Sequence, residues 1–459
     1  MVGDLSKQVN TWDSLYRAWR EAAQEKQGEA LLGFLRSTFQ EYLVARAAAM
    51  ASGVDLQPTV ERAVRNLEDT AWHEVVRWVA GPQDTVGTQQ QAAAALVVAI
   101  LDAPGDPRAR ARHAILAGGC LVDLGEEGVT VAARERGITA LRHAMQDAAP
   151  DGHPNDPPLV PIAARYAAGE VLDRLGWLPP DLDAWVEVQM SSLPSPLFSL
   201  QPPTSSLHSR IITVGRYPVT NVQFGRFIAA GGYENPAYWG GEDSKDWRWR
   251  VKAHPGYRRE GPVTQPEYWN HPRLGREQRG YPVVGVSWYE AMAYCRWLEE
   301  QLRIGDYRLR VWRDGQLETS NLPPETVSVR LPAEEEWVTA AGGLEDGRYP
   351  WGPKWHASRA NTREGGVGGT TPVAMYPSGQ SPWGIWDMGG NVWEWTRSAD
   401  DEAQRRSILR CGSWLDVYRL ARVAVRGWYF PAQSYHYVGF RVVVSPANAG
   451  TSTMRGSER

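Results

Sequence analysis

Residues 410–444 decide the fold: they read RCGSWLDVYRLARVAVRGWYFPAQSYHYVGFRVVV and follow SPWGIWDMGGNVWEWT at 381–396. Large apolar and aromatic side chains crowd the later stretch. They keep neither the period of two expected of a strand nor the 3.6 period of a helix. Arginines, glycines and one proline between them are typical of a framework. We interpret the stretch as a rigid scaffold that displays a surface.

The composition is that of a folded, multi-domain protein. Its 459 residues are enough for two or three domains with their own cores. With 49 basic and 53 acidic residues the formal net charge is -4, so no overall field attracts nucleic acid or an anionic membrane. No secretory signal and no run of about 18 apolar residues is found. We therefore expect a cytoplasmic protein with no nucleic-acid or membrane partner.

The three cysteines, Cys120, Cys295 and Cys411, stand far apart in the sequence. This pattern fits neither a disulfide framework nor the paired ligands of a zinc site.

The chain divides by composition into a helical part and a tryptophan-rich part. Residues 1–183 predict an α-helical domain, a solenoid or bundle, because apolar residues recur at spacings of three and four. Residues 184–209 are rich in Pro, Ser and Leu and predict a linker. Residues 210–445 predict an irregular, loop-rich module with helices at 221–230 and 288–302. The polar residues 446–459 predict a disordered tail.

Two segments of the helical part, FLRSTFQEYLVARA at 34–47 and AWHEVVRWVAG at 71–81, resemble the helical region that follows the nucleotide-binding core of NACHT-type ATPases. The resemblance implies a link to a signalling ATPase; a generic helical packing domain is the alternative. No Gly-rich loop ending in Gly-Lys-Ser/Thr is present, so we expect no nucleotide cofactor.

Five segments in fixed order carry a second resemblance: GRYPVTNVQFGRFI at 215–228, YPVVGVSWYEAMAYCRWL at 281–298, VRLPAEEEWVTAA at 329–341, the run 369–396, and the closing RCGSW to GFRVV. They resemble the formylglycine-generating enzyme (sulfatase-modifying factor) family, a variant of the C-type lectin fold. The resemblance covers over half the chain and implies an α+β fold class. It leaves function open, because this fold serves enzymes and binders alike.

Two enzymatic branches of the family lack their metal ligands here. In one, a cysteine pair holds copper, but the family pattern places Asp416 and Tyr418 at those positions, and neither replaces a thiolate for Cu(I). Cys411 stands where the family usually has glycine, and we interpret it as a packed residue. The other branch, the sulfoxide synthases, takes iron from three histidines of a helical bundle. The N-terminal histidines show no such spacing: His73, His113, His143 and His153.

A third branch fits better: the variable proteins of diversity-generating retroelements. Their C-terminal framework reads Arg-Gly-Gly-Ser-Trp, then Arg, Ala, Arg, Pro and Gly-Phe-Arg, with hypervariable positions between. This chain departs from that framework only at Cys411. Most intervening residue types are reachable by mutating adenines in an asparagine codon, although Trp428 is not. The framework positions are Arg410, Gly412, Ser413, Trp414, Arg422, Ala424, Arg426, Pro431, Gly439, Phe440 and Arg441.

We therefore predict a non-catalytic protein that binds a protein ligand through this segment. Aromatic side chains give contact area at low entropy cost. Alternatives are that they belong to the core, that they pack on the helical domain, or that the protein is a copper- or iron-dependent oxidase. The predicted ligand-binding residues are Leu415, Asp416, Tyr418, Leu420, Val423, Val425, Trp428, Tyr429, Phe430, Gln433, Tyr435, His436 and Tyr437.

The family resemblance also implies one structural calcium site and no copper. Its ligands would be the side chains of Asp387 and Glu394 and the carbonyl oxygens of Gly390 and Val392, which suit a hard cation. The alternative is a pair of turn-capping carboxylates. A second family site lacks its carboxylate, because Gly365 stands at that position.

Overall fold

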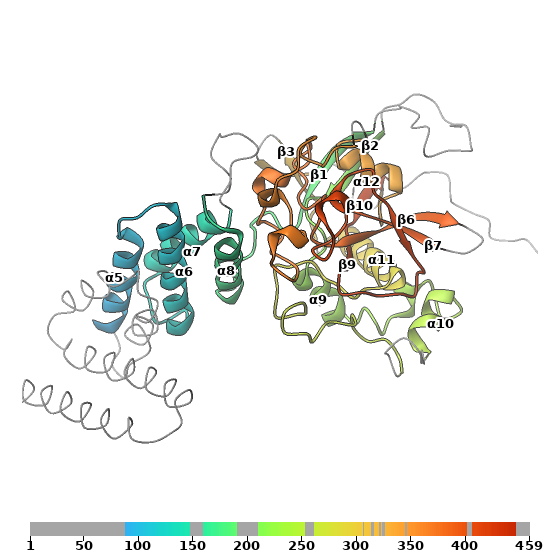
Figure 1. The fold of residues 1–459 in the computed structure, drawn as a ribbon. Coiled ribbons are helices and arrows are strands. Elements are labelled where there is room, and N and C mark those ends of the chain that lie inside the picture. Colours follow the sequence, from blue (N-terminus) through green and yellow to red (C-terminus); the bar gives the residue numbers. More distant parts are fainter. Residues whose placement is uncertain are drawn as a thin grey trace, which may run out of the picture. The chain divides into compact units, whose positions relative to one another are not determined.

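The computed structural model describes residues 88–146, 159–190, 210–252, 261–305, 307–313, 316–320, 323, 326–344, 347–401 and 406–446. The chain forms two compact units, Met1–Ala144 and Met145–Arg459. Figure 1 shows helices in the first and two sheets with helices in the second. None of the described helices is long and apolar enough to cross a membrane.

The described part of the first unit is helical, as predicted. Its helices are α5 (Thr88–Asp102), α6 (Pro107–Leu124) and α7 (Val131–Met145). Asp106 caps α6, because its carboxylate accepts the N–H of Ala109 at 2.8 Å and Pro107 follows at the first helical position. The two NACHT-like segments, 34–47 and 71–81, lie outside the described residues.

Helix α8 (Ile162–Arg174) belongs to the second unit, so the predicted domain boundary at 183 is wrong. Arg165 is fully buried and donates to the carbonyl oxygens of Met145 (2.9 Å), Ser358 (3.2 Å) and Met375. The carboxylate of Asp173 accepts the N–H of Gly280 at 2.9 Å. Residue composition predicts that α8 is a helix, but it does not predict which distant segment α8 packs against.

Among the described residues, a six-stranded sheet has the order β4-β3-β1-β2-β10-β5. Strand β1 is antiparallel to β2 with Val188 opposite Ile212, and parallel to β3. The linker prediction is therefore wrong at 184–190, and the tail prediction is wrong at Pro446, which pairs with Val327. The remaining linker and tail residues lie outside the described part. The strands are β1 (Ala184–Met190), β2 (Arg210–Gly215), β3 (Arg310–Arg313), β4 (Gln316–Thr319), β5 (Val327–Arg330) and β10 (Val443–Pro446).

A second described sheet has the order β8-β7-β6-β9, and it carries the C-terminal segment. Strand β7 is antiparallel to both β6 and β8, whereas β9 is parallel to β6. In Figure 1 these strands are the orange-red elements, with α11 close to β9. The strands are β6 (Trp393–Asp401), β7 (Arg406–Arg410), β8 (Gly427–Tyr429) and β9 (Val438–Phe440).

The two helices predicted for the module are confirmed as α9 (Asn221–Ala229) and α11 (Trp288–Ile304). Ser287 opens α11 with a capping box: its hydroxyl accepts the N–H of Glu290 at 3.2 Å, and the Glu290 carboxylate accepts the N–H of Ser287 at 2.8 Å. The other described helices are α10 (Lys245–Val251), α12 (Glu334–Ala340), η1 (Pro236–Trp239), η4 (Ala357–Arg359), η5 (Arg363–Gly365), η6 (Pro377–Gly379) and η7 (Tyr418–Ala421).

Buried aromatic rings pin the loops of the module, as its composition predicts. Phe224 of α9 stacks on Tyr294 of α11 with ring centroids 5.5 Å apart. The indole N–H of Trp239 donates to the Gly232 carbonyl at 2.9 Å, and that of Trp395 donates to Val286 at 2.9 Å. Each ring therefore fills the core while its polar atom satisfies a loop carbonyl.

A buried ion pair connects the two sheets. Arg441, just after β9, donates Nε to Glu394 Oε2 and Nη2 to Glu394 Oε1, both at 2.7 Å, and neither side chain is exposed. Its Nη1 also donates to the Gly215 carbonyl of β2 at 3.0 Å.

We expect Arg441→Met to destabilise the protein by roughly 3–5 kcal/mol, because it leaves the Glu394 carboxylate buried without its cation. Arg313→Met is the matched control: its ion pairs with Glu187 and Glu318 are half-exposed, so it should cost less than about 1 kcal/mol. Denaturant unfolding measures both. Equal losses would contradict this role for Arg441.

Candidate ligand-binding surface

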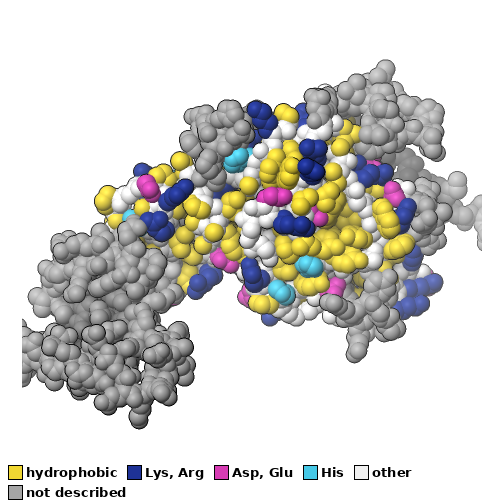
Figure 2. Space-filling model, viewed as in Figure 1, with side chains coloured by type: hydrophobic (Ala, Val, Ile, Leu, Met, Phe, Trp, Pro, Cys, Tyr) yellow, Lys and Arg dark blue, Asp and Glu magenta, His cyan; other side chains and the backbone are white. Residues whose placement is uncertain are grey.

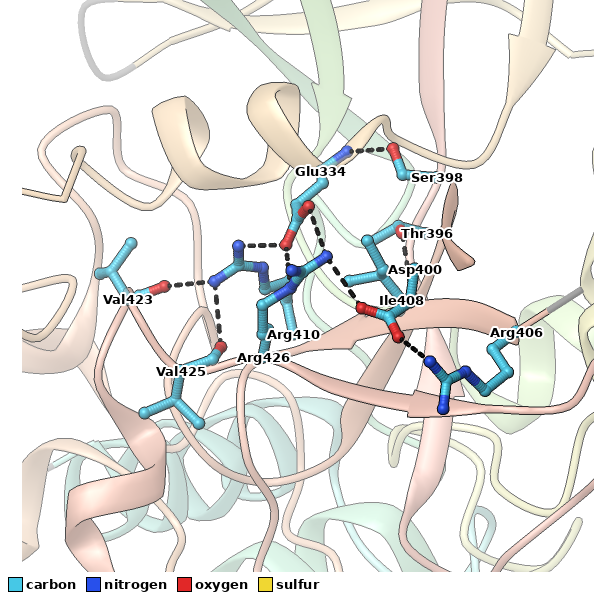
Figure 3. A network of polar contacts seen from close by, with 10 residues as sticks. All are labelled: Glu334, Thr396, Ser398, Asp400, Arg406, Ile408, Arg410, Val423, Val425 and Arg426. Atoms are coloured by element: carbon cyan, nitrogen blue, oxygen red, sulfur yellow. Dashed lines mark hydrogen bonds and ion pairs between the residues drawn. The ribbon is translucent and has the colours of Figure 1, made fainter. Parts of the chain in front are cut away.

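Framework arginines fix the backbone beneath the predicted surface. Arg410 ends β7, and its Nη1 donates to the carbonyl oxygens of Val423 and Val425, each at 3.1 Å. Its Nη2 pairs with Glu334 at the start of α12 (Figure 3). Because Arg410 is buried, these bonds hold residues 423–425 against the end of β7.

The same network extends to the edge strand β8. Arg426 lies 3.0 Å from Glu334 and 3.5 Å from Asp400, and Asp400 accepts from Arg406 at 2.7 Å (Figure 3). The Arg406 guanidinium lies 4.0 Å from the ring centroid of Trp428. Trp428 is thus oriented by a cation that is itself held by a carboxylate.

The predicted ligand-binding residues differ widely in exposure. Leu415, Trp428 and Phe430 are 39%, 44% and 42% exposed. Val423 is fully buried in a core cluster, so its prediction as a surface residue is wrong. The others are half-buried: Asp416, Tyr418, Leu420, Val425, Tyr429, Gln433, Tyr435, His436 and Tyr437.

The side chain of Asp416 stabilises the start of the segment through two hydrogen bonds. Its Oδ2 accepts from the indole N–H of Trp393 at 2.8 Å and from the hydroxyl of Ser413 at 2.6 Å. Trp393 opens β6, so the Asp416 carboxylate ties the start of the segment to the sheet.

Three tyrosines, Tyr429, Tyr435 and Tyr437, form one cluster. Tyr435 lies 4.6 Å from Tyr429 and 5.4 Å from Tyr437 between ring centroids, and the hydroxyls of Tyr429 and Tyr437 are 2.9 Å apart. Burial raises the pKa of Tyr437. All three rings also pack against the core. Each ring is thus partly exposed and partly packed against the core.

His436 joins this cluster to residues outside the segment. Its ring lies 5.0 Å from Tyr437, 5.5 Å from Trp414 and 5.6 Å from Tyr268 between centroids. Burial lowers the pKa of His436. Sequence analysis missed Tyr268, because no spacing links residue 268 to the C-terminal segment. Figure 2 shows hydrophobic side chains gathered over the part of the second unit where Figure 1 places β6 and β9.

Tyr418 contacts a different group. Its ring lies 5.4 Å from Trp355, which in turn lies 5.4 Å from Tyr349. Sequence analysis also missed these two residues.

Two of the four residues predicted to bind calcium, Glu394 and Gly390, have their ligand oxygens engaged by other donors. Both oxygens of Glu394 accept from Arg441, and Oε2 also accepts from the indole N–H of Trp337 at 2.7 Å. The thiol of Cys411 donates to the carbonyl oxygens of Gly390 at 3.0 Å and Asp387 at 3.2 Å. A calcium ion at this position would have to displace these donors.

Asp387 is buried, and its Oδ2 has no hydrogen-bond partner among the described residues. Burial raises the pKa of this carboxyl to about 8, and burial also raises the pKa of the Cys411 thiol. Cys411 has a φ of 98°, a backbone conformation that suits glycine, which the resembled family usually has there. No cluster of three or more His, Cys, Asp or Glu side chains suited to a metal occurs in the described residues.

We expect the thermal unfolding midpoint to be the same in millimolar calcium and in EDTA. A bound ion would raise the midpoint with concentration by mass action. Here the Glu394 carboxylate is already engaged by Arg441, and the Gly390 carbonyl accepts from the Cys411 thiol. Magnesium serves as the control for ionic strength. A calcium-specific rise would contradict this assignment.

Residues 187–446, more than half of the chain, match the family model described as "Sulfatase-modifying factor enzyme 1-like domain". The chain belongs to this family. The match begins inside β1 and ends with β10, in agreement with the described sheet. Together with the mixed helices and sheets, it confirms the predicted α+β class and the formylglycine-generating-enzyme type of module.

Relatives within the sulfatase-modifying factor family include proteins named inactive. The inactive C-alpha-formylglycine-generating enzyme 2 of Mus musculus is 32% identical over 257 residues, which cover 50% of this chain and 73% of that protein. The Bos taurus protein of the same name is 35% identical over 183 residues, 36% of this chain. The chain thus spans 51% of the bovine relative's length.

Named enzymes match as well. The formylglycine-generating enzyme of Thermomonospora curvata is 28% identical over 286 residues, 51% of this chain and 82% of that enzyme. Among solved structures, Treponema denticola variable protein 1 aligns with 57% of this chain and 95% of its own at 19% identity and a TM-score of 0.35. That structural likeness is too weak to bear on function.

Proposed function

We propose that this protein is a non-catalytic binder that recognises a protein ligand through the surface around Trp428 and Phe430. The observation that carries the proposal is that these two rings are 44% and 42% exposed on a buried, hydrogen-bonded framework. Exposed large aromatic side chains on a rigid scaffold are typical of interaction surfaces.

The exposed rings are held in one arrangement before any ligand binds. Strand β8 pairs with β7 so that Trp428 stands opposite Ile408. Phe430 meets Trp428 edge to face, with centroids 6.2 Å apart. Gln433 accepts the N–H of Phe430 at 3.0 Å, which closes the turn that follows. A preorganised surface loses little entropy on binding, and truncating a central ring should cost about 2 kcal/mol of affinity.

The chemistry of the segment supports binding rather than oxidation. Asp416 and Tyr418 stand where the family resemblance implies the copper-binding cysteines, and the Asp416 carboxylate is occupied by Trp393 and Ser413. The cysteines themselves, Cys120, Cys295 and Cys411, are buried. Stoichiometric Cu(I) binding together with oxidation of a cysteine-containing peptide would overturn this part of the proposal in favour of the oxidase.

We further propose that the segment is diversified, as in the variable proteins of diversity-generating retroelements. Two framework glycines stand where a side chain would disturb the fold: Gly412 has a φ of 71°, and a Cβ on Gly439 would lie 2.6 Å from the Val283 carbonyl. Leu415, Trp428 and Phe430 are exposed, so we expect these positions to tolerate exchange. Fixed and replaceable positions thus alternate along one segment, as such a system requires.

Sequencing the locus from many individuals of the source population tests this proposal. We expect substitutions concentrated at the codons of Leu415 and Phe430, and none at Arg410 or Arg441. The codon of Val423 should also stay constant, because its side chain is fully buried. A segment as uniform as the rest of the gene would contradict diversification.

A further inference from the structure

A second aromatic surface lies beside η7, away from Trp428 in the sequence. We call it the basic aromatic face and define it by Trp351, Lys354, Trp355, Tyr418, Arg419 and Arg422. Its three rings are half-buried, and its three cations are exposed.

The rings form a continuous stack on a buried floor. Tyr349 is buried and stacks on Trp351 with centroids 5.2 Å apart and planes within 7°. Trp355 lies 5.9 Å from Trp351 and 5.4 Å from Tyr418. The indole N–H of Trp351 donates to the Lys354 carbonyl at 2.9 Å, which fixes the loop that carries both tryptophans.

Two arginines rest on the tyrosines of this stack. The Arg419 guanidinium lies 5.6 Å from the ring centroid of Tyr418, and the Arg422 guanidinium lies 5.6 Å from that of Tyr349. Each donates Nε to the hydroxyl of its tyrosine, at 3.2 Å and 3.4 Å. Among the described residues, no hydrogen bond engages the two terminal nitrogens of either guanidinium, the pair that matches a carboxylate.

Among the residues that the structure describes, the guanidinium contacts of both arginines are with tyrosines, and neither meets a carboxylate. An acid that contacts this face, Glu364, accepts the N–H of Tyr418 at 3.0 Å and the hydroxyl of Thr362 at 2.7 Å. Oriented cations without an acidic partner, set beside aromatic rings, are complementary to an anionic and partly apolar ligand.

We propose that the basic aromatic face binds an acidic segment of the protein ligand, with carboxylates on Arg419 and Arg422 and apolar stems on Trp355. This inference rests on the proposed binding function and names the chemistry of its partner. A peptide fits better than nucleic acid, because the formal net charge of the chain is -4 and nucleic-acid binding favours a broadly basic surface.

Part of the basic aromatic face would stay constant among related proteins that differ only in a diversified C-terminal segment. Trp351 and Trp355 lie outside the C-terminal segment, and Arg422 is a framework position. Members of such a set would therefore keep the two tryptophans and Arg422, whereas Tyr418, one of the predicted ligand-binding positions, would vary together with Trp428 and Phe430.

Fluorescence anisotropy with labelled oligoglutamate, oligoglutamine and oligothymidylate on the full chain tests the inference. We expect salt-sensitive binding of oligoglutamate that Arg419→Gln with Arg422→Gln weakens about tenfold, because two charge-assisted contacts are lost. The matched control removes two exposed arginines of the same unit, Arg248→Gln with Arg276→Gln, and should leave binding unchanged.

Equal binding of oligoglutamate and oligoglutamine would overturn the inference, as would equal losses in both double variants. Tighter binding of oligothymidylate, lost in the Arg419 and Arg422 variant, would assign the face to nucleic acid instead. Trp428→Ala should leave oligoglutamate binding intact, so failure of the acidic face is distinguished from failure of the Trp428 surface. Unchanged thermal unfolding confirms that each variant is folded.

Discussion

The buried pair of Glu394 and Arg441 is the interaction on which the module depends. Two opposite charges without solvent are stable only when nearly every donor and acceptor is used. Here the indole N–H of Trp337 in α12 donates a further hydrogen bond to the Glu394 carboxylate. The remaining guanidinium N–H groups of Arg441 donate to the carbonyl oxygens of Gly215 and Trp386. This one ion pair therefore connects a helix, a loop and both described sheets.

That constraint explains how an irregular segment keeps its shape. Residues 411–437 contain few regular backbone hydrogen bonds, yet Arg410 fixes one end and Arg441 the other. Between these ends, Asp416 is bonded to Trp393, and the three-tyrosine cluster is packed on the core. The outward side chains therefore contribute little to the fold, which leaves them available for recognition.

Sequence patterns predicted the elements whose causes are local. Ser287 and Glu290 form the capping box that predicts the start of α11. The high tryptophan content predicts loops held by buried rings. The predictions that were wrong concern features that depend on residues far away in the sequence. Strand β1 sits in a Pro-rich context and becomes a strand only through its neighbours β2 and β3. Val423 is of the same residue type as the half-buried Val425, yet it is fully buried beside Arg410, which bonds to its carbonyl.

In the candidate site, too, the sequence does not show contacts between distant residues. The family pattern indicated oxygens for calcium, but whether Glu394 is available depends on Arg441, which lies 47 residues further along the chain. Cys411 reaches the Gly390 and Asp387 carbonyls only because β7 ends beside that loop. The basic aromatic face likewise arises from two segments that no sequence spacing connects.

The central claim is that residues 410–441 consist of a buried framework and a replaceable surface. Saturation mutagenesis of this segment, read out by protease resistance of the displayed full chain, tests it most directly. We predict that most substitutions at Leu415, Trp428 and Phe430 preserve folding, whereas those at Arg410, Gly412, Gly439 and Arg441 abolish it. Equal intolerance at Trp428, Phe430 and Arg441 would show that the aromatic residues serve the core and would contradict the claim.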